Sequence, residues 1–197
     1  VSGCFLSYGV RQNCSKMTYT MEDIPAFKQE SNMLAKQNYL SAIYFELGTY
    51  YYRGVRNDIT KKWSDVDKDL MLEKQFGGQL KEQGLFKDLI HRVDGKSDLE
   101  KAQEIYDYIK SQISWNHYVG KYAQNGIKKS LESRVGNVGD INLALVTALQ
   151  AAKISCYPVI LATRDNETPN KLHPVITNFN YVIAHVKIDD QEYFLDA

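Results

Sequence analysis

Apolar and polar residues follow three different patterns along the chain. In the first, up to about residue 60, side chains alternate with the period of two that is typical of a strand. The alternation is clearest between residues 39 and 52, where Ile43 and Phe45 share one face. We therefore predict β-rich structure here. We interpret tyrosines 50–52 as strand residues that cover a sheet, rather than as a platform for a sugar or a base.

The second region, from about residue 61 to 95, has the spacing of helices. Ser64 is the expected N-cap of its first helix, because Asp65 follows in the first turn, where the helix dipole favours negative charge. The pair Gly77–Gly78 is expected to break or kink the helical pattern. Residues 93–96 contain an Asp-Gly pair and are expected to form a turn.

The third region, residues 96–197, indicates a buried helix followed by a sheet. Ser97 and Glu100 have the spacing of a capping box, which predicts a helix that begins there. The segment Ile141–Ala152 is apolar on nearly every side, as in a buried central helix. Strands are then expected at Cys156–Thr163, Tyr181–Ile188 and Tyr193–Asp196. This order of elements predicts an α+β fold with an antiparallel sheet.

Composition narrows the classes of partner. The 197 residues are enough for one large domain or two small ones, and the 24 basic and 24 acidic residues balance. A net charge of zero gives no electrostatic reason to expect nucleic acid, and no apolar run is long enough to span a bilayer. The four histidines show neither i,i+4 pairs nor a neighbouring Cys-x-x-Cys, so we expect no metal site, and we expect no cofactor.

The three cysteines argue against a disulfide scaffold. Cys4 and Cys14 either pair across a short loop or serve as small apolar residues. The chain starts with Val1 rather than Met and shows no basic leader followed by an apolar stretch. We therefore expect a fragment or a processed form.

Three short segments carry the candidate chemistry. Gly136–Asp140 is a glycine-containing turn in front of the buried helix, Phe179–Ile183 opens a strand, and Phe194–Ala197 contains Leu-Asp-Ala. A thiol at a helix N-terminus is activated by amide donors and partial positive charge. A histidine beside it moves the proton, and a carboxylate orients the histidine.

In this order, the three segments resemble the transglutaminase-like superfamily, which has the papain-like fold. The resemblance implies a Cys-His-Asp triad, and it places Val138 at the cysteine, Tyr181 at the histidine and Asp196 at the carboxylate. Valine has no nucleophilic atom, and tyrosine is a poor base at neutral pH because its pKa is ordinarily near 10. The mapping thus predicts a degenerate triad, in which Tyr181 still donates a hydrogen bond to Asp196.

Further segments resemble a bacterial subgroup in which this core follows a β-rich domain of unknown function. These segments are Gly139–Leu143, Tyr157–Arg164, Ile24–Glu30 and Phe76–Gly77. The resemblance implies three parts: the end of a β-sandwich-like domain at 1–60, a helical connector at 61–95 and the core at 96–197. It also implies an exported protein of the periplasm or cell envelope, cut at both ends, with its core truncated after Asp196.

Three more residues are candidates for the cleft. Trp115 begins a loop that lies near the active cleft in the family, although core packing explains it equally well. Asp140 is more simply a partner for the helix dipole and for nearby amides. Arg164 could pair with Asp165 at a strand end instead of contacting a substrate. Asn142, polar on an apolar helix, is expected to bind a neighbouring loop.

Two classes of function follow. The leading hypothesis is a catalytically silent binding or scaffold module, with a peptide, a glycan or another protein domain as its partner. The alternative is an active cysteine protease or acyltransferase whose nucleophile is Cys156 and whose base is His185. Cys156 lies far along the chain from the helix N-terminus, and a buried free cysteine is the simpler interpretation. A purely architectural domain, with a filled cleft beneath Val138, is a third possibility.

Overall fold

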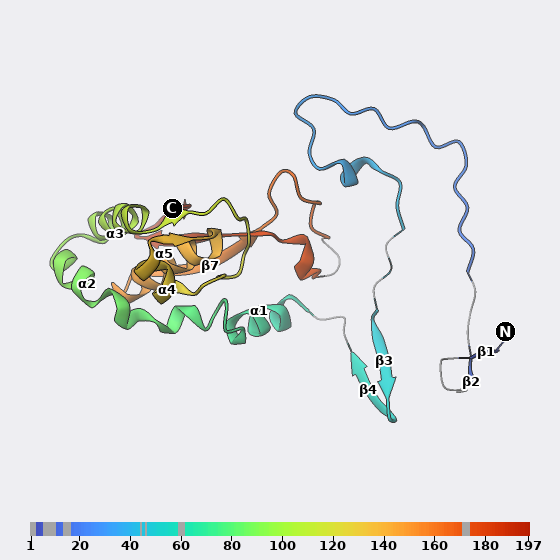
Figure 1. Cartoon of the computed structure of the whole chain (residues 1–197), viewed down its shortest axis with the longest axis horizontal. Coiled ribbons are helices and arrows are strands. Elements are labelled where there is room, and N and C mark those ends of the chain that lie inside the picture. Colours follow the sequence, from blue (N-terminus) through green and yellow to red (C-terminus); the bar gives the residue numbers. More distant parts are fainter. Residues whose placement is uncertain are drawn as a thin grey trace.

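A central helix packed on a three-stranded antiparallel sheet forms the part of the chain that holds the candidate site (Figure 1). The computed structural model describes residues 3–5, 11–13, 17–43, 45, 47–58, 62–170 and 174–197. Cys14 lies outside these residues, as does the side chain of Cys4, so the question of their pairing does too.

The segment before residue 60 extends away from the core in Figure 1. Its described strands form two hairpins, β1 (Gly3–Phe5) with β2 (Arg11–Asn13) and β3 (Thr49–Tyr52) with β4 (Val55–Asp58). The strand predicted over residues 39–52 is therefore wrong at the described residues before 49, and Lys36–Tyr39 is a short 3₁₀ helix. Phe45 is 76% exposed. Tyr19 contacts the Phe45 ring at 5.8 Å, centroid to centroid, but no strand pairs with the described residues of 39–48, and alternation forms a strand only where neighbouring elements cover the apolar face.

The region that follows is helical, as predicted, but its first cap differs. Helix α1 spans Trp63–Leu72, and its N-cap is Lys62 rather than Ser64. The amide of Lys62 donates to the Asp65 carboxylate at 3.2 Å, so the acidic residue sets the start of the helix. The predicted break is present, since α1 ends at Leu72 and the Gly77 amide folds back to donate to the Leu70 carbonyl at 3.1 Å. Only glycine fits there, because a Cβ would lie 2.2 Å from the Met71 carbonyl oxygen.

Two short 3₁₀ helices, Gln79–Lys81 and Gln83–Phe86, lead from this break into α2 (Lys87–Val93). The predicted turn follows, with the amide of Lys96 donating to the carbonyl of Val93 and Gly95 at a φ of 78°. Phe86, Leu89 and Val93 are buried in the same core as the later elements. The segment predicted as a connector thus packs as part of the core, while the three-part division of the chain stays a prediction.

The predicted capping box at Ser97 and Glu100 is confirmed, and it opens α3 (Asp98–Gln112). A two-residue strand β5 (Ser114–Trp115) then pairs in parallel with β6 (Val135–Gly136). Helix α4 (Ile127–Ser133) lies between them in sequence. The β5–β6 pairing matters for the site, since it sets Trp115 beside the residues that enter the central helix.

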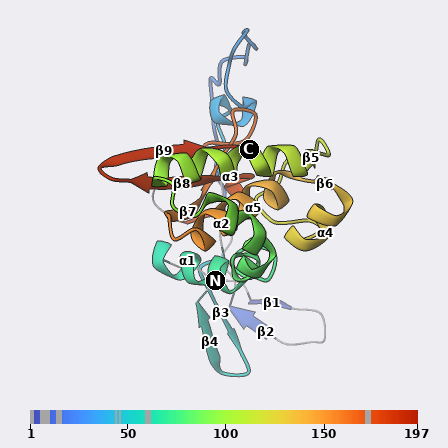
Figure 2. The same ribbon diagram turned by 90° about the vertical axis from the view of Figure 1, so that its left-hand side faces the viewer.

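The central helix α5 spans Val138–Ala151 and is buried over almost its whole length. It packs on the sheet of β7 (Ser155–Leu161), β8 (Tyr181–Ile188) and β9 (Gln191–Leu195), joined in that order (Figure 2). The predicted α+β fold is confirmed, and the strand limits differ from the prediction by at most two residues. Val182, Ala184 and Val186 form the buried face of β8, each with no exposed surface.

Candidate functional site

The site begins at the N-terminus of α5, where Asn137 and Asp140 cap the helix reciprocally. The Asn137 side-chain oxygen accepts from the Asp140 amide at 2.8 Å, and the Asp140 carboxylate accepts from the Asn137 amide at 3.1 Å. This pair was missed from the sequence, although Asn-x-x-Asp before an apolar run is its signal. The cap makes Val138 the first residue of the helix, with 4% of its surface exposed.

Two N–H groups beside Val138 converge on one carbonyl. The amide of Val138 donates to the Tyr118 carbonyl oxygen at 3.3 Å, and the indole nitrogen of Trp115 donates to the same oxygen at 3.1 Å. The Trp115 ring also lies 4.8 Å from the His117 ring, centroid to centroid. The loop after β5 is therefore bound to the start of α5 through the Tyr118 carbonyl, and the Trp115 indole holds the same carbonyl from within the loop.

Tyr181 and Asp196 meet at the other side of the site. The Tyr181 hydroxyl lies 2.9 Å from one carboxylate oxygen of Asp196 and donates to it, as expected from the sequence. The second oxygen accepts from the Asn142 side-chain amide at 2.7 Å. Asn142 also donates to the Val182 carbonyl and accepts from the Ala197 amide. Its partners are thus strand β8 and the end of the chain, not the loop that we expected.

A small pocket of about 170 Å³ joins these groups. It is lined by Trp115, Val138, Ile141, Asn142, Tyr181, Asp196 and Ala197. The structure therefore brings the three predicted triad positions and Trp115 to one place. Its volume is below the roughly 300 Å³ at which pockets for drug-sized ligands begin, so it offers room for a single side chain or a small group.

The chemistry available in this pocket differs from that of a Cys-His-Asp triad. Burial, the hydrogen bond to Asp196 and the negative charge of Asp196 raise the pKa of Tyr181 to about 12. Tyr181 is therefore protonated at neutral pH and acts as a hydrogen-bond donor rather than as a base. Val138 offers a methyl-bearing surface where a nucleophile would need a thiol. The pocket can hold a group by contact and hydrogen bonding.

Replacing Tyr181 with Phe tests this hydrogen bond through the pH dependence of stability. A tyrosine whose pKa is about 12 in the folded state and near 10 when unfolded contributes stability below pH 10. That contribution is lost as pH rises from 10 to 12, because the unfolded chain ionises first. We expect the decline over this window to be shallower in Tyr181→Phe, as measured by urea unfolding at stepped pH. An unchanged slope would contradict the raised pKa that burial and the hydrogen bond to Asp196 give Tyr181.

Two other predicted cleft residues do not line this pocket. Asp140 is completely buried, and its carboxylate accepts from the amides of Asn125 and Gly126 at 3.1 and 2.9 Å, so it anchors a loop. Arg164 is exposed, and its backbone carbonyl accepts from the Ala35 amide at 3.0 Å. No ion pair joins Arg164 to Asp165 among the described residues. Asp140 is therefore structural in this arrangement, and the side chain of Arg164 lies outside the pocket.

Cys156 and His185 do not form a nucleophilic pair. In the antiparallel ladder Cys156 lies opposite Val186, and Tyr157 lies opposite His185, so the thiol and the imidazole point to opposite faces of the sheet. Burial raises the pKa of the Cys156 thiol to about 12. His185 instead stacks on Phe194, with 4.9 Å between the ring centroids. A buried thiol with a raised pKa is a poor nucleophile.

Neither a metal cluster nor a membrane span is found in the described part of the chain. No group of three or more His, Cys, Asp or Glu side chains lies close enough there to hold a metal ion. Among the same residues, no helix has the length and apolar character needed to cross a bilayer.

Comparison with known proteins identifies the family. The family model described as "Transglutaminase-like superfamily" matches residues 87–195, more than half of the chain, so the chain belongs to that superfamily. A crystal structure described as that of a "putative protease" from Parabacteroides distasonis is 18% identical, with a TM-score of 0.48 over 68% of this chain. The match covers 25% of that protein, so this chain spans about a quarter of its length. No curated protein matches the chain.

Proposed function

We propose that this transglutaminase-like chain is a catalytically degenerate domain that acts as a binding or scaffold module. The observation that carries the proposal is Val138 at the first turn of α5, in the same pocket as Tyr181 and Asp196. A nucleophile at that position would receive the amide donors and the positive end of the helix dipole. Valine can use neither, so the position supports packing and contact instead of covalent catalysis.

The hydrogen bonds around this pocket support a retained structural role. Asn142 and Tyr181 donate to the two oxygens of Asp196, which ties α5 and β8 to the end of the chain. In an active triad the carboxylate orients a histidine. In this pocket Asp196 orients Tyr181 instead. The arrangement thus has defined geometry without a proton-accepting group matched to neutral pH.

The proposed partner is a peptide, a glycan or another protein domain, and the proposed setting is a bacterial exported or envelope protein. The setting rests on the resemblance of segments within the core and before it to a bacterial subgroup. The volume of the pocket favours a partner that inserts one side chain or one small group.

An acyl-transfer assay tests the proposal. The protein is incubated with casein as the glutamine donor and dansylcadaverine as the amine, and peptide hydrolysis is followed in parallel. We expect no incorporation and no cleavage above background. The double substitution Val138→Cys with Tyr181→His provides a matched comparison, since it restores both missing groups beside Asp196. Turnover by the wild-type protein that is abolished by Cys156→Ser would sink the proposal and support the cysteine enzyme.

Thiol labelling gives a second expected result. Because burial raises the pKa of Cys156 to about 12, this thiol should resist iodoacetamide at pH 8 in the folded protein and react fully in urea. Peptide mapping by mass spectrometry reads Cys156 separately from Cys4 and Cys14. In the Val138→Cys/Tyr181→His variant, the new thiol should react faster than Cys156. Rapid labelling of Cys156 in the folded wild type would contradict the inert-thiol interpretation.

A further inference from the structure

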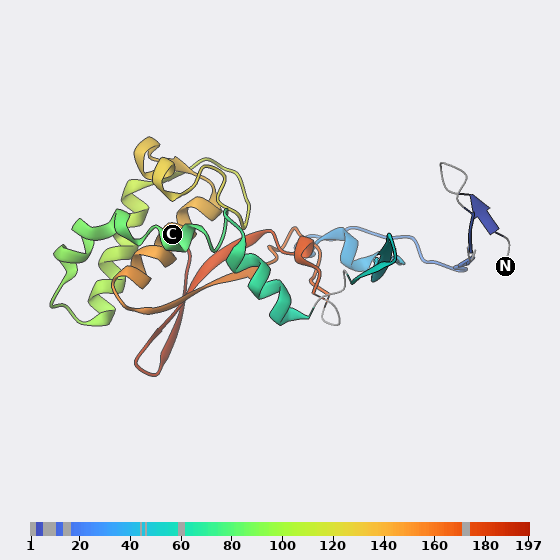
Figure 3. The same cartoon turned by 90° about the horizontal axis from the view of Figure 1, so that it is seen from below.

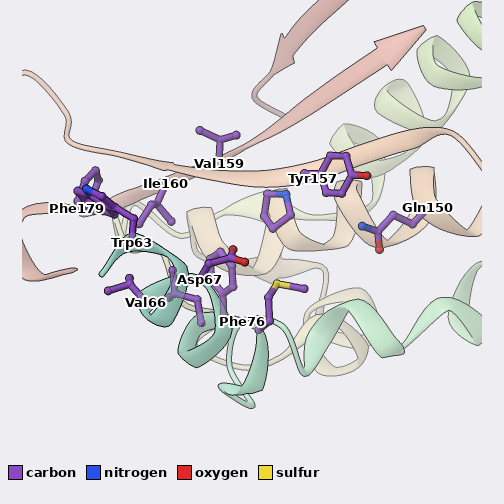
Figure 4. Close-up of a pocket in the computed structure, with 12 residues that line it drawn as sticks. Trp63, Val66, Asp67, Phe76, Gln150, Tyr157, Val159, Ile160 and Phe179 are labelled. Atoms are coloured by element: carbon purple, nitrogen blue, oxygen red, sulfur yellow. The ribbon is translucent and has the colours of Figure 1, made fainter. Parts of the chain in front are cut away.

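A second and larger groove lies away from the candidate site, between helix α1 and the free edge of strand β7. Its volume is about 390 Å³, within the range of pockets that bind ligands. Figure 4 shows Trp63, Val66 and Phe76 on the α1 side and Tyr157 and Ile160 on the strand. The view from below in Figure 3 shows α1 lying next to the sheet.

Strand β7 is an edge strand, because the sheet has the order β7–β8–β9. In an antiparallel ladder, alternate residues direct their N–H and C=O groups to the partner strand and the others direct them outward. The Leu161 carbonyl accepts from the Asn180 amide on the β8 side, at 3.1 Å. Residues 157, 159 and 161 therefore face β8, and residues 156, 158 and 160 face the groove.

Three features of the outward-facing residues agree with this assignment. Pro158 has no N–H, so it fits a position that the ladder does not use. The Cys156 carbonyl is capped by the Gln150 side-chain amide at 2.8 Å, which closes the edge at that end. Beyond the cap, the carbonyls of Pro158 and Ile160 and the amide of Ile160 have no hydrogen-bond partner among the described residues. An edge of this kind is a template for another extended strand.

The groove also carries one uncompensated charge. Asp67 lines it from α1, is exposed, and has no ion-pair partner in the described part of the chain. No lysine or arginine lines the groove, and most of its other lining residues are apolar or aromatic. An occupant with apolar side chains and one positive charge is therefore complementary to it.

From these observations we infer that the groove binds an extended peptide segment of a partner protein, with alternating apolar side chains and one lysine or arginine. The segment adds as a strand to the free edge of β7 at Ile160, places apolar side chains against Val66 and Phe76, and sets its basic residue at Asp67. The inference does not depend on the degenerate pocket, which lies among other residues.

Two synthetic peptides test the inference by fluorescence anisotropy. The first is fluorescein-labelled Thr-Val-Thr-Lys-Thr-Val-Thr, in which Lys shares one face of the strand with both Val residues, and the second has Glu in place of Lys. We expect the lysine peptide to bind and the glutamate peptide to bind roughly threefold more weakly at low salt, since an exposed ion pair contributes only modestly. Asp67→Lys should invert this preference. Asp107→Lys, an equal charge change at an exposed position on α3, should leave it unchanged.

The backbone contact is tested separately at Ile160. Ile160→Pro removes the outward N–H and should weaken peptide binding about tenfold, whereas Ile160→Ala keeps the N–H and should weaken it less. In the wild type, the lysine peptide should slow hydrogen exchange of the Ile160 amide. This exchange measurement keeps the test decisive if the proline variant does not fold.

Three outcomes would overturn the inference. The first is no binding of either peptide, and the second is binding with no added protection at Ile160. The third is protection at Ile160 that rises with protein concentration in the absence of peptide, because it would identify a second copy of this chain as the occupant. Sedimentation velocity of the unliganded protein distinguishes that case.

Discussion

Replacing Gly139 with alanine is expected to lower the free energy of unfolding by about 3 kcal/mol. Gly139 is the second residue of α5, and a Cβ there would lie 2.2 Å from the Tyr122 carbonyl oxygen and 2.9 Å from the Ala123 nitrogen. Both are backbone atoms, so no side-chain rotation relieves the overlap. The loop at Tyr122 would have to move away from the helix that it crosses, and urea unfolding followed by circular dichroism measures the loss.

Gly84 provides the matched control. A Cβ at Gly84 meets no atom closer than the end of the Lys87 side chain, 4.0 Å away. Gly84→Ala should therefore change stability by less than about 0.5 kcal/mol. If Gly139→Ala unfolds at the wild-type urea midpoint, the close passage of the loop over α5 is incorrect.

Replacing Asp140 with alanine is expected to cost about 3–5 kcal/mol, the second large effect. Its buried carboxylate accepts from three backbone amides, those of Asn125, Gly126 and Asn137. Alanine leaves all three donors without a partner, and it removes the link between α5 and the loop before α4. Asp140→Asn retains one acceptor oxygen and should fall between alanine and wild type. The same urea titration measures both variants.

Asp98 serves as the comparison, since it is also an acidic residue in the first turn of a helix. Its side chain is exposed and pairs with Lys101 at 3.1 Å. Asp98→Ala should cost less than about 1 kcal/mol, because exposed ion pairs and dipole contacts are weak. Equal losses for the Asp98 and Asp140 variants would show that Asp140 contributes through the helix dipole alone.

These two neighbours explain why the turn before α5 tolerates Val138, the residue that the resemblance to the family places at the nucleophile position. Gly139 permits the loop at Tyr122 to lie against the helix, and Asp140 ties the next residues of that loop to it. Neither role involves the side chain of residue 138. The turn before α5 is therefore held in place without the side chain of residue 138, as the proposed binding or scaffold role requires.

The sequence by itself determined the elements of the core. The capping box at Ser97, the buried helix near residues 141–152 and the strand at Tyr181–Ile188 were predicted, because caps and periodicity depend on residues a few positions apart. It also predicted, from the order of three segments, which residues take the triad positions of the family, and the structure brings these three residues to one pocket. The prediction of Ser64 as an N-cap was wrong, because the Asp65 carboxylate accepts from the amide of Lys62. The helix therefore begins after Lys62, which lies two residues before Ser64.

Tertiary structure decided what each polar residue does. Asn142 binds Asp196 across 54 positions of sequence, and Asp140 binds a loop 14 and 15 positions away; no local pattern encodes either contact. The ladder register set Cys156 and His185 on opposite faces, which the spacing of the two residues in sequence does not reveal. The free edge of β7 likewise follows from the order of the strands. Such contacts depend on how elements pack, because burial makes distant residues neighbours.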